Sequence, residues 1–226
     1  MKNDKSKKQL TEQERKTIRF YNEQGRNWVQ KREPNKESLW ATEIEELHRL
    51  LPAGKLLEIG VGGGKEARLL IKKGYDYVGV DASIGILEVA KQYLPANTAL
   101  YVASLHELPF EDNLFDGFWT AATLLHIPKD RINDALQSIK RVIKTGGVGF
   151  ISLREGVGEG LDDAGTGRWF ALYQEEEFTK ILNNNGFDVL ACAKRIQPSC
   201  TVKGRGWIMF FVRVVKNKFL GEKNHD

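Results

Sequence analysis

The sequence predicts an α/β fold in which a mostly parallel sheet carries helices on both faces. From Lys55 onward, short apolar runs alternate with amphipathic segments, and no internal repeat or low-complexity linker interrupts them. Strand and helix at this spacing form crossover connections, which join parallel strands. With 226 residues, 41% of them hydrophobic, one domain with appended helices can bury a core without disulfides or a structural metal.

The elements are expected in the following order. Two helices over residues 9–24 and 37–51, separated by a polar break around Pro34, precede the alternating region. Strands are expected at 56–59, 77–80, 99–102, 115–120, 148–153, 187–193 and 206–215, and helices at 64–73, 84–93, 129–143 and 174–185. We expect an N-terminal tail and helical lid over 1–52, a core over 53–215 and a charged C-terminal tail over 216–226.

The net charge of +4 is concentrated at the two ends of the chain. Residues 1–16 hold six basic and three acidic side chains, and residues 213–226 hold four and two, which leaves the middle close to neutral. A nucleic-acid-binding protein usually shows a basic stripe on its folded face. The charge distribution therefore predicts no specific nucleic-acid partner.

The chain also shows no membrane or secretion signal. Its longest apolar run, Trp207–Val212, has six residues, far fewer than the ~20 of a membrane-spanning helix. The first ten residues contain no apolar stretch typical of a signal sequence. Cys192 and Cys200 lie outside any CxxC or metal-ligand spacing. We expect a cytoplasmic protein without a metal site.

The first crossover carries a glycine-rich turn. The apolar strand Leu56–Ile59 runs directly into Gly60-Val61-Gly62-Gly63-Gly64, and an amphipathic helix follows. Glycine lets the backbone turn tightly and lets a ligand approach the amides at a helix start. Asp81 ends the next apolar run, 21 residues after Gly60, where a carboxylate can reach a ribose. The alternatives are a plain turn and an N-cap, which Ser83 can also provide.

The positions of the glycines bear on two other nucleotide-binding patterns. A Walker loop is excluded because Ile59 and Glu66 occupy positions that require Gly and Ser or Thr. The dinucleotide fingerprint from Gly60 lacks its third glycine at Lys65, although the looser G-x-G-x-x-A form is present from Gly62 to Ala67. A nucleotide-dependent oxidoreductase therefore stays open as an alternative.

A series of motifs resembles the class I S-adenosylmethionine-dependent methyltransferases over roughly residues 17–215. The motifs, in chain order, are Glu58–Gly64, Asp81, Ala103–Phe110, Phe115–Phe118, Leu125–Pro128 and Gly146-Gly147. The resemblance implies a Rossmann-like seven-stranded sheet with a final antiparallel hairpin, and S-adenosylmethionine as the cofactor. The implied cofactor-binding residues are Glu58, Gly60, Gly62, Gly64, Asp81, Ala82, Ser104 and Leu105.

By the same resemblance, the glycines face the methionine part of the cofactor, Asp81 binds the ribose, and Ser104 and Leu105 lie beside the adenine. His106 could stack or hydrogen-bond near the adenine. The family commonly has Asp where this chain has Ser104, so the contact to the adenine amine is expected to differ. It also commonly has Lys-Pro-Gly-Gly where this chain has Lys144-Thr145-Gly146-Gly147, which changes a turn.

The acceptor is expected outside the repeating core. His126 follows the fourth strand, where a substrate should lie, and is the candidate base, with a structural role at the helix start as its alternative. The lid and the glycine-rich loop 154–173 offer the substrate candidates Tyr21, Trp28, Arg154, Arg168 and Trp169. Similar loops in small-molecule members of the family favour a small-molecule methyl acceptor. A non-catalytic cofactor-binding partner protein is the remaining alternative.

Overall fold

The computed structural model contains one seven-stranded sheet with the order β3-β2-β1-β4-β5-β9-β8. It describes residues 9–31, 37–162, 164–196 and 206–216. The parallel strands are β1 (Lys55–Ile59), β2 (Asp76–Asp81), β3 (Ala99–Val102), β4 (Phe115–Ala121) and β5 (Ile143–Arg154). β8 (Phe187–Ile196) and β9 (Gly206–Val214) form an antiparallel hairpin, and β9 is antiparallel to β5. The predicted fold class is confirmed.

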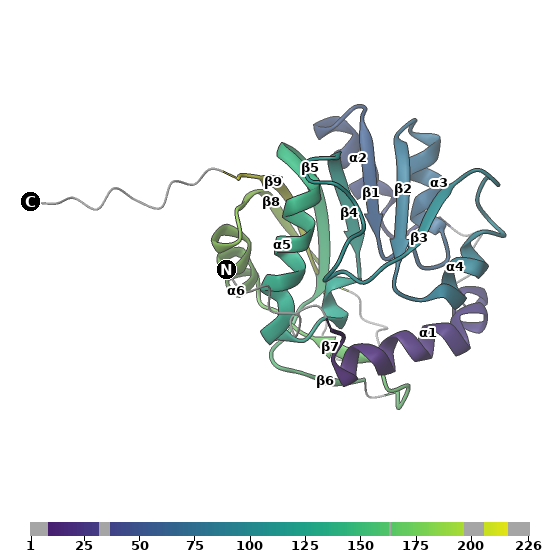
Figure 1. Ribbon diagram of the computed structural model, residues 1–226. Coiled ribbons are helices and arrows are strands. Elements are labelled where there is room, and N and C mark those ends of the chain that lie inside the picture. Colours follow the sequence, from purple (N-terminus) through teal and green to yellow (C-terminus); the bar gives the residue numbers. More distant parts are fainter. Residues whose placement is uncertain (1–8, 32–36, 163, 197–205, 217–226) are drawn as a thin grey trace, which may run out of the picture.

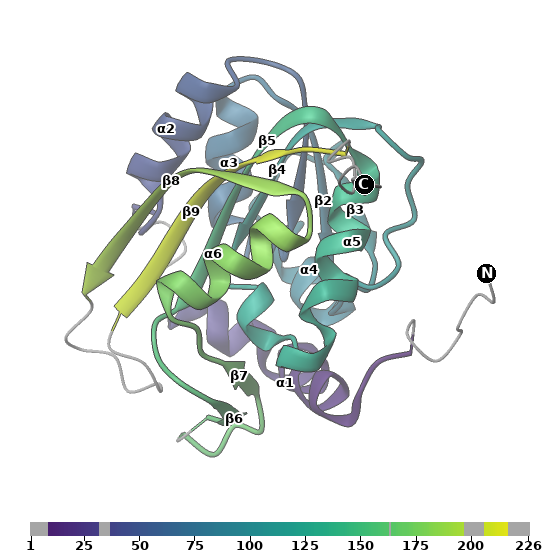
Figure 2. The same ribbon diagram turned by 90° about the vertical axis from the view of Figure 1, so that its left-hand side faces the viewer.

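Helices cover both faces of this sheet. α2 (Ala41–Leu50) and α3 (Lys65–Lys72) lie on one face, and α5 (Ile132–Val142) lies on the other (Figures 1 and 2). α4 (Ile84–Ala90) packs against β2 and β3, and α6 (Glu175–Asn184) packs against β8. The short 3-10 helices η2 (Leu124–His126) and η3 (Lys129–Arg131) connect β4 to α5. In the described part of the chain, no helix is long and apolar enough to cross a membrane.

The N-terminal helix α1 (Glu12–Gln30) crosses beneath the carboxyl ends of the parallel strands (Figure 1). It begins at a capping box, in which Thr11 Oγ1 accepts a hydrogen bond from the Glu14 amide at 3.2 Å and the Glu14 carboxylate accepts one from the Thr11 amide at 2.8 Å. This start and the continuation to Gln30 differ from the expected range of 9–24, because apolar periodicity alone does not mark helix ends.

A small antiparallel sheet lies beside α1. It consists of β6 (Glu159–Leu161) and β7 (Trp169–Ala171), within the stretch that was expected to be a loop. The many glycines of this stretch interrupt the alternation of apolar and polar residues, so the sequence pattern does not predict these strands. We call α1 together with residues 158–162 and 164–171 the roof, because both lie across the carboxyl edge of the large sheet and cover it (Figure 1).

α2 lies apart from the roof. Although the expected lid spans residues 1–52, α2 packs against α3 and β5 as part of the helical layer. Residues 1–8 and 217–226, which include most of the two charged tails, lie outside the described residues, as does Cys200.

The sheet register brings the candidate motifs to one edge. Ile59 pairs with Val80, and the Gly60 amide donates to the Val80 carbonyl at 2.8 Å, so Gly60 and Asp81 follow adjacent strand ends. Behind this edge, the fully buried rings of Trp119 and Phe150 stack with centroids 4.1 Å apart. The edge therefore rests on a tightly packed apolar core.

Candidate active site

A cavity of about 580 Å³ lies between the carboxyl edge of the sheet and the roof. This volume is within the range of about 300–1,000 Å³ that is typical of small-molecule and cofactor sites. Many of the residues predicted for the site line it. They are Tyr21, Trp28, Gly60, Gly62, Asp81, Ala82, Ser104, Leu105, His126, Arg154 and Arg168.

The glycine loop forms one wall of the cavity, and its members differ in their roles. Gly60 has φ +82°, and a Cβ there would lie 2.0 Å from Thr123 Oγ1, so this glycine is required by packing. Gly62 has φ +53°, and a Cβ there would meet only the Trp28 ring at 3.9 Å, so its backbone is open to a ligand. Gly64 lies outside the cavity lining and is the N-cap residue of α3.

Asp81 connects the glycine loop to the start of α4. Its Oδ2 accepts a hydrogen bond from the Gly62 amide at 3.0 Å, and its Oδ1 accepts one from the Ser83 amide at 2.9 Å. Burial raises the pKa of the Asp81 carboxyl, and these two hydrogen bonds offset the rise only in part. Ser83 provides the helix cap, since its Oγ accepts from the Ile86 amide at 3.2 Å. Asp81 therefore presents a half-buried carboxylate to the cavity.

Two glutamates lie below and beside the glycine loop. Glu58, a predicted cofactor residue, is buried outside the cavity lining and accepts a hydrogen bond from Tyr77 Oη at 2.5 Å. Burial and the nearby Glu66 raise the pKa of Glu58 well above its ordinary value. Glu66, which the sequence did not single out, lines the cavity and accepts from Ser38 Oγ at 2.5 Å. Glu58 therefore lies beneath the glycine loop and does not face the cavity.

His126 is held at both ring nitrogens. Its Nδ1 lies 2.6 Å from the Trp169 carbonyl oxygen, and its Nε2 lies 3.1 Å from Tyr21 Oη. Because a carbonyl only accepts, Nδ1 carries the hydrogen and Nε2 faces the Tyr21 hydroxyl as an acceptor. Burial lowers the pKa of His126 to about 4, so the imidazole is neutral at physiological pH.

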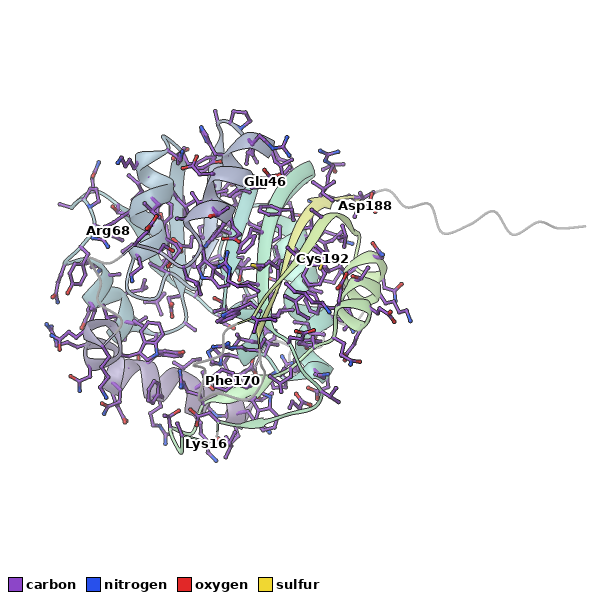
Figure 3. All side chains as sticks on the ribbon, turned by 180° about the vertical axis from the view of Figure 1, so that it is seen from behind. Lys16, Glu46, Arg68, Phe170, Asp188 and Cys192 are labelled. Atoms are coloured by element: carbon purple, nitrogen blue, oxygen red, sulfur yellow. The ribbon has the colours of Figure 1, made fainter. Side chains whose placement is uncertain are left out.

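Arg168 approaches Tyr21 from the roof. Its Nη1 lies 3.4 Å from Tyr21 Oη, and its Nη2 forms an ion pair with Asp162 at 3.0 Å. Its guanidinium lies 4.8 Å from the centroid of the Phe20 ring and 5.3 Å from that of Phe170. In Figure 3, Phe170 lies nearer the large sheet, whereas Lys16 lies at the outer edge of the molecule. The guanidinium is thus fixed between aromatic rings.

The remaining substrate candidates are placed differently. Trp28 packs edge-on against Tyr21 with ring centroids 5.4 Å apart, as expected for residues two helical turns apart. Arg154 is buried in the cavity wall, 3.8 Å above the Trp207 ring. Trp169 lies outside the cavity lining, and its indole donates to Glu159 at 3.2 Å. Its backbone contributes instead, because it bonds both His126 and Thr17.

Several lining residues had no signal in the sequence. Glu14 and Thr17 of α1, Ala122 after β4, and Phe170 of β7 all line the cavity or bond to residues that do. The pattern Thr11-x-x-Glu14 indicates a helix start, but it does not predict that Glu14 bonds to a histidine 92 positions away. Ala122 has φ +55°, a strained backbone conformation next to the cavity.

Comparisons with known proteins agree with this geometry. Residues 57–151 match the model of a methyltransferase domain. An uncharacterized protein of Methanocaldococcus jannaschii is 37% identical over 114 residues, which are 49% of this chain and 50% of that protein. The ubiquinone/menaquinone biosynthesis C-methyltransferase UbiE of Agrobacterium fabrum is 33% identical over 104 residues, 42% of this chain and 39% of that protein. This chain thus spans half or less of the length of these relatives.

A solved structure shows the same fold over nearly the whole chain. It is the 1,6-didemethyltoxoflavin-N1-methyltransferase of Burkholderia thailandensis, with bound 1,6-didemethyltoxoflavin and S-adenosylhomocysteine. It aligns with a TM-score of 0.71 at 18% identity and covers 92% of each chain.

Residues 57–151 therefore match a methyltransferase domain, in agreement with the motif series that resembles the class I S-adenosylmethionine-dependent methyltransferases. The cavity fits S-adenosylmethionine, because it combines the open backbone at Gly62, the half-buried carboxylate of Asp81 and sufficient volume. The family does not favour the alternative of a nucleotide-dependent oxidoreductase.

Proposed function

We propose that this chain transfers a methyl group from S-adenosylmethionine to a small-molecule acceptor by in-line displacement. The observation that carries the proposal is that a single continuous cavity between the large sheet and the roof contains both the cofactor end and the acceptor end. The cofactor end is lined by Gly60, Gly62, Asp81 and Ser104, and the acceptor end by Tyr21, His126, Arg168 and Phe170. A cavity of about 580 Å³ beneath a helix suits a small acceptor better than a macromolecule.

At the cofactor end, the proposal assigns each residue by its chemistry. The backbone of the glycine loop would hold the methionine part, and Asp81 would accept hydrogen bonds from the ribose hydroxyls. Ala82, Ser104 and Leu105 would contact the adenine. When bound, S-adenosylmethionine supplies an electrophilic methyl group on a sulfonium. The protein's own task is then to align the acceptor atom with that group and to exclude water.

At the acceptor end, Tyr21 and His126 would act as a pair. Tyr21 and His126 both line the cavity, and the Tyr21 hydroxyl lies 3.1 Å from His126 Nε2, so an acceptor that reaches the hydroxyl would contact a coupled pair. If the acceptor loses a proton, Tyr21 oxygen can receive it while passing its own proton to Nε2. Because its pKa is lowered to about 4, His126 is a weak base, and its main contribution would be to orient Tyr21.

Arg154, Arg168 and Trp28 would select and orient the acceptor. Two guanidinium groups and the indole ring give this end polar donors and apolar surface together. Arg168 is neutralised in part by Asp162, so it favours a polar acceptor group over a fully charged one. Trp169 would contribute through its backbone, which holds His126 and α1 in place.

The proposal can be tested with S-adenosylmethionine that is labelled in its methyl group. The purified protein is incubated with a small-molecule extract of cells and, separately, with total protein and RNA. The expected result is label in the small-molecule fraction, and none above background in the other two. Label in protein or RNA would overturn the small-molecule acceptor, and binding of S-adenosylhomocysteine without transfer to any fraction would favour a non-catalytic partner protein.

A further inference from the structure

The N-terminal helix contributes a buried carboxylate to the cofactor end of the cavity. The Glu14 side chain is only 3% exposed, yet it lines the cavity together with Ser104 and Leu105. Its Oε1 lies 2.5 Å from His106 Nε2 in the loop after β3. The His106 amide in turn donates to Ser104 Oγ at 3.2 Å. Glu14 is thus bonded to the segment that the proposed function places beside the adenine.

The Glu14 carboxylate keeps unused acceptor capacity. Oε2 accepts hydrogen bonds from the Thr11 amide and the Thr11 hydroxyl, both at 2.8 Å, and Oε1 accepts one from His106. A carboxylate offers about four lone-pair sites, so one remains. Burial raises the pKa of Glu14, but the hydrogen bonds from His106 and Thr11 outweigh it and the net pKa is lowered. An ionised carboxylate only accepts hydrogen bonds.

The paired histidine lies behind this carboxylate, because His106 bonds to Glu14 but does not line the cavity. The Glu14 carboxylate is therefore the group that a ligand meets. A ligand group with N–H hydrogens can donate to it, whereas a carbonyl oxygen would face its lone pairs. The carboxylate thus discriminates between an amine and a carbonyl.

We propose that Glu14, supplied by the N-terminal helix, accepts a hydrogen bond from the exocyclic amine of the adenine and makes the site specific for an adenosyl cofactor. The inference rests on the proposed function, which puts the adenine beside Ser104 and Leu105. It gives α1 a role at the cofactor end in addition to its role in covering the acceptor. Ser104 stands where the family commonly has Asp and offers no carboxylate, so the carboxylate comes from another element.

The test compares two ligands that differ in this one group. S-adenosylhomocysteine carries the amine, and S-inosylhomocysteine carries a carbonyl oxygen in its place. Affinities are measured by titration calorimetry for the wild-type protein, Glu14→Gln and the control Glu12→Gln. Glu12 lies on the same first turn of α1 but is 57% exposed and pairs with Arg15. Glutamine at position 14 also retains the capping box, so α1 should keep its start.

The wild-type protein and Glu12→Gln are expected to prefer S-adenosylhomocysteine by about 10- to 100-fold, the effect of a hydrogen bond to a charged group. In Glu14→Gln the preference should fall to about threefold or less, because an amide can both donate and accept. If Glu14→Gln does not fold, Glu14→Asp, which keeps the charge but shortens its reach, should also lose most of the preference.

Three results would overturn the inference: no preference in the wild-type protein, an unchanged preference in the variants, or an equal loss of affinity for both ligands. The last would mean that Glu14 only holds α1 in place. Failure of the proposed function looks different, because it is measured as the absence of methyl transfer to small molecules and does not depend on the preference between the two ligands.

Discussion

At the cofactor end of the cavity, the contacts between the sheet motifs join residues that are close in the sequence, whereas the contacts of α1 at the acceptor end join residues more than a hundred positions apart. Gly62 and Asp81 are 19 positions apart and meet through adjacent parallel strands. Tyr21 is 105 positions from His126, and Thr17 is 152 positions from Trp169. The first end follows from the crossover topology itself, and the second depends on how the roof packs. The comparison implies that changes in the roof can alter the acceptor while the cofactor end is retained.

The largest expected effect is at Gly60. Alanine there would force φ +82° on a Cβ and place it 2.0 Å from Thr123 Oγ1. We expect Gly60→Ala to lower the free energy of unfolding by about 3–5 kcal/mol and to abolish cofactor binding. Urea unfolding and calorimetry with S-adenosylhomocysteine measure both. Gly146→Ala is the matched control, since Gly146 has φ +83° but nothing within 4 Å of a Cβ, and it should cost only about 1–2 kcal/mol.

Asp81 is expected to have the next largest effect, on affinity. Asp81→Asn removes the charge that would receive the ribose hydroxyls, and should weaken binding of S-adenosylhomocysteine by about 1.5–3 kcal/mol. Some loss of stability should accompany it, because two backbone amides bond to this carboxylate. Asp76→Asn, at the exposed start of the same strand, should leave the affinity unchanged. Equal affinity of both variants for S-adenosylhomocysteine would show that Asp81 does not contact the cofactor.

His126 should make the acceptor end sensitive to acid. Its pKa is about 4 in the folded protein and about 6.5 in the unfolded chain, so between these values only the unfolded chain binds the proton. Its contribution to stability is therefore complete above pH 6.5 and falls as the pH decreases toward 4. Between pH 7.5 and 5, we expect the wild-type protein to lose roughly 2 kcal/mol more than His126→Gln.

Urea unfolding of both proteins at the two pH values isolates this residue. The buried carboxyl of Glu58, whose pKa is raised, contributes with the opposite sign but equally to both proteins. Parallel pH profiles would show that His126 is not buried as a neutral imidazole.

The smallest effect is expected where the two parts of the roof meet. Thr17 Oγ1 accepts a hydrogen bond from the Trp169 amide at 2.9 Å. Thr17→Val keeps the shape but removes the acceptor, so we expect a loss of about 1 kcal/mol and faster hydrogen exchange at the Trp169 amide. Thr179→Val, the same change on α6, should leave that amide protected. An unchanged exchange rate of the Trp169 amide in Thr17→Val would show that this hydrogen bond does not hold α1 against β7.

The sequence predicted the sheet because its evidence is local. Apolar runs, the glycine loop and Asp81 each fall within a short window, and the register then brings Gly60 and Asp81 to one edge without further information. The strands of the roof were missed because Gly158 and Gly160 lie in and beside β6, where a loop is the ordinary expectation.

The acceptor end was predicted only in part, for the same reason. The seven-residue spacing of Tyr21 and Trp28 placed both rings on one helix face, which the structure confirms. No comparable spacing in the sequence predicts which distant residue a side chain will contact in the folded protein. The bond from the Trp169 backbone to His126 at the acceptor end, like the bond from Glu14 to His106 at the cofactor end, depends on where the roof lies, and no spacing in the sequence encodes that position.

The division of the cavity into two ends is tested most directly by measuring the affinity of Tyr21→Phe for S-adenosylhomocysteine. The change removes one hydroxyl, which bonds to His126 Nε2 at the acceptor end. The account predicts a dissociation constant within about twofold of wild type, while methyl transfer falls by about 100-fold. A weakening of cofactor binding as large as that expected for Asp81→Asn would contradict it, because the two ends would then act as one.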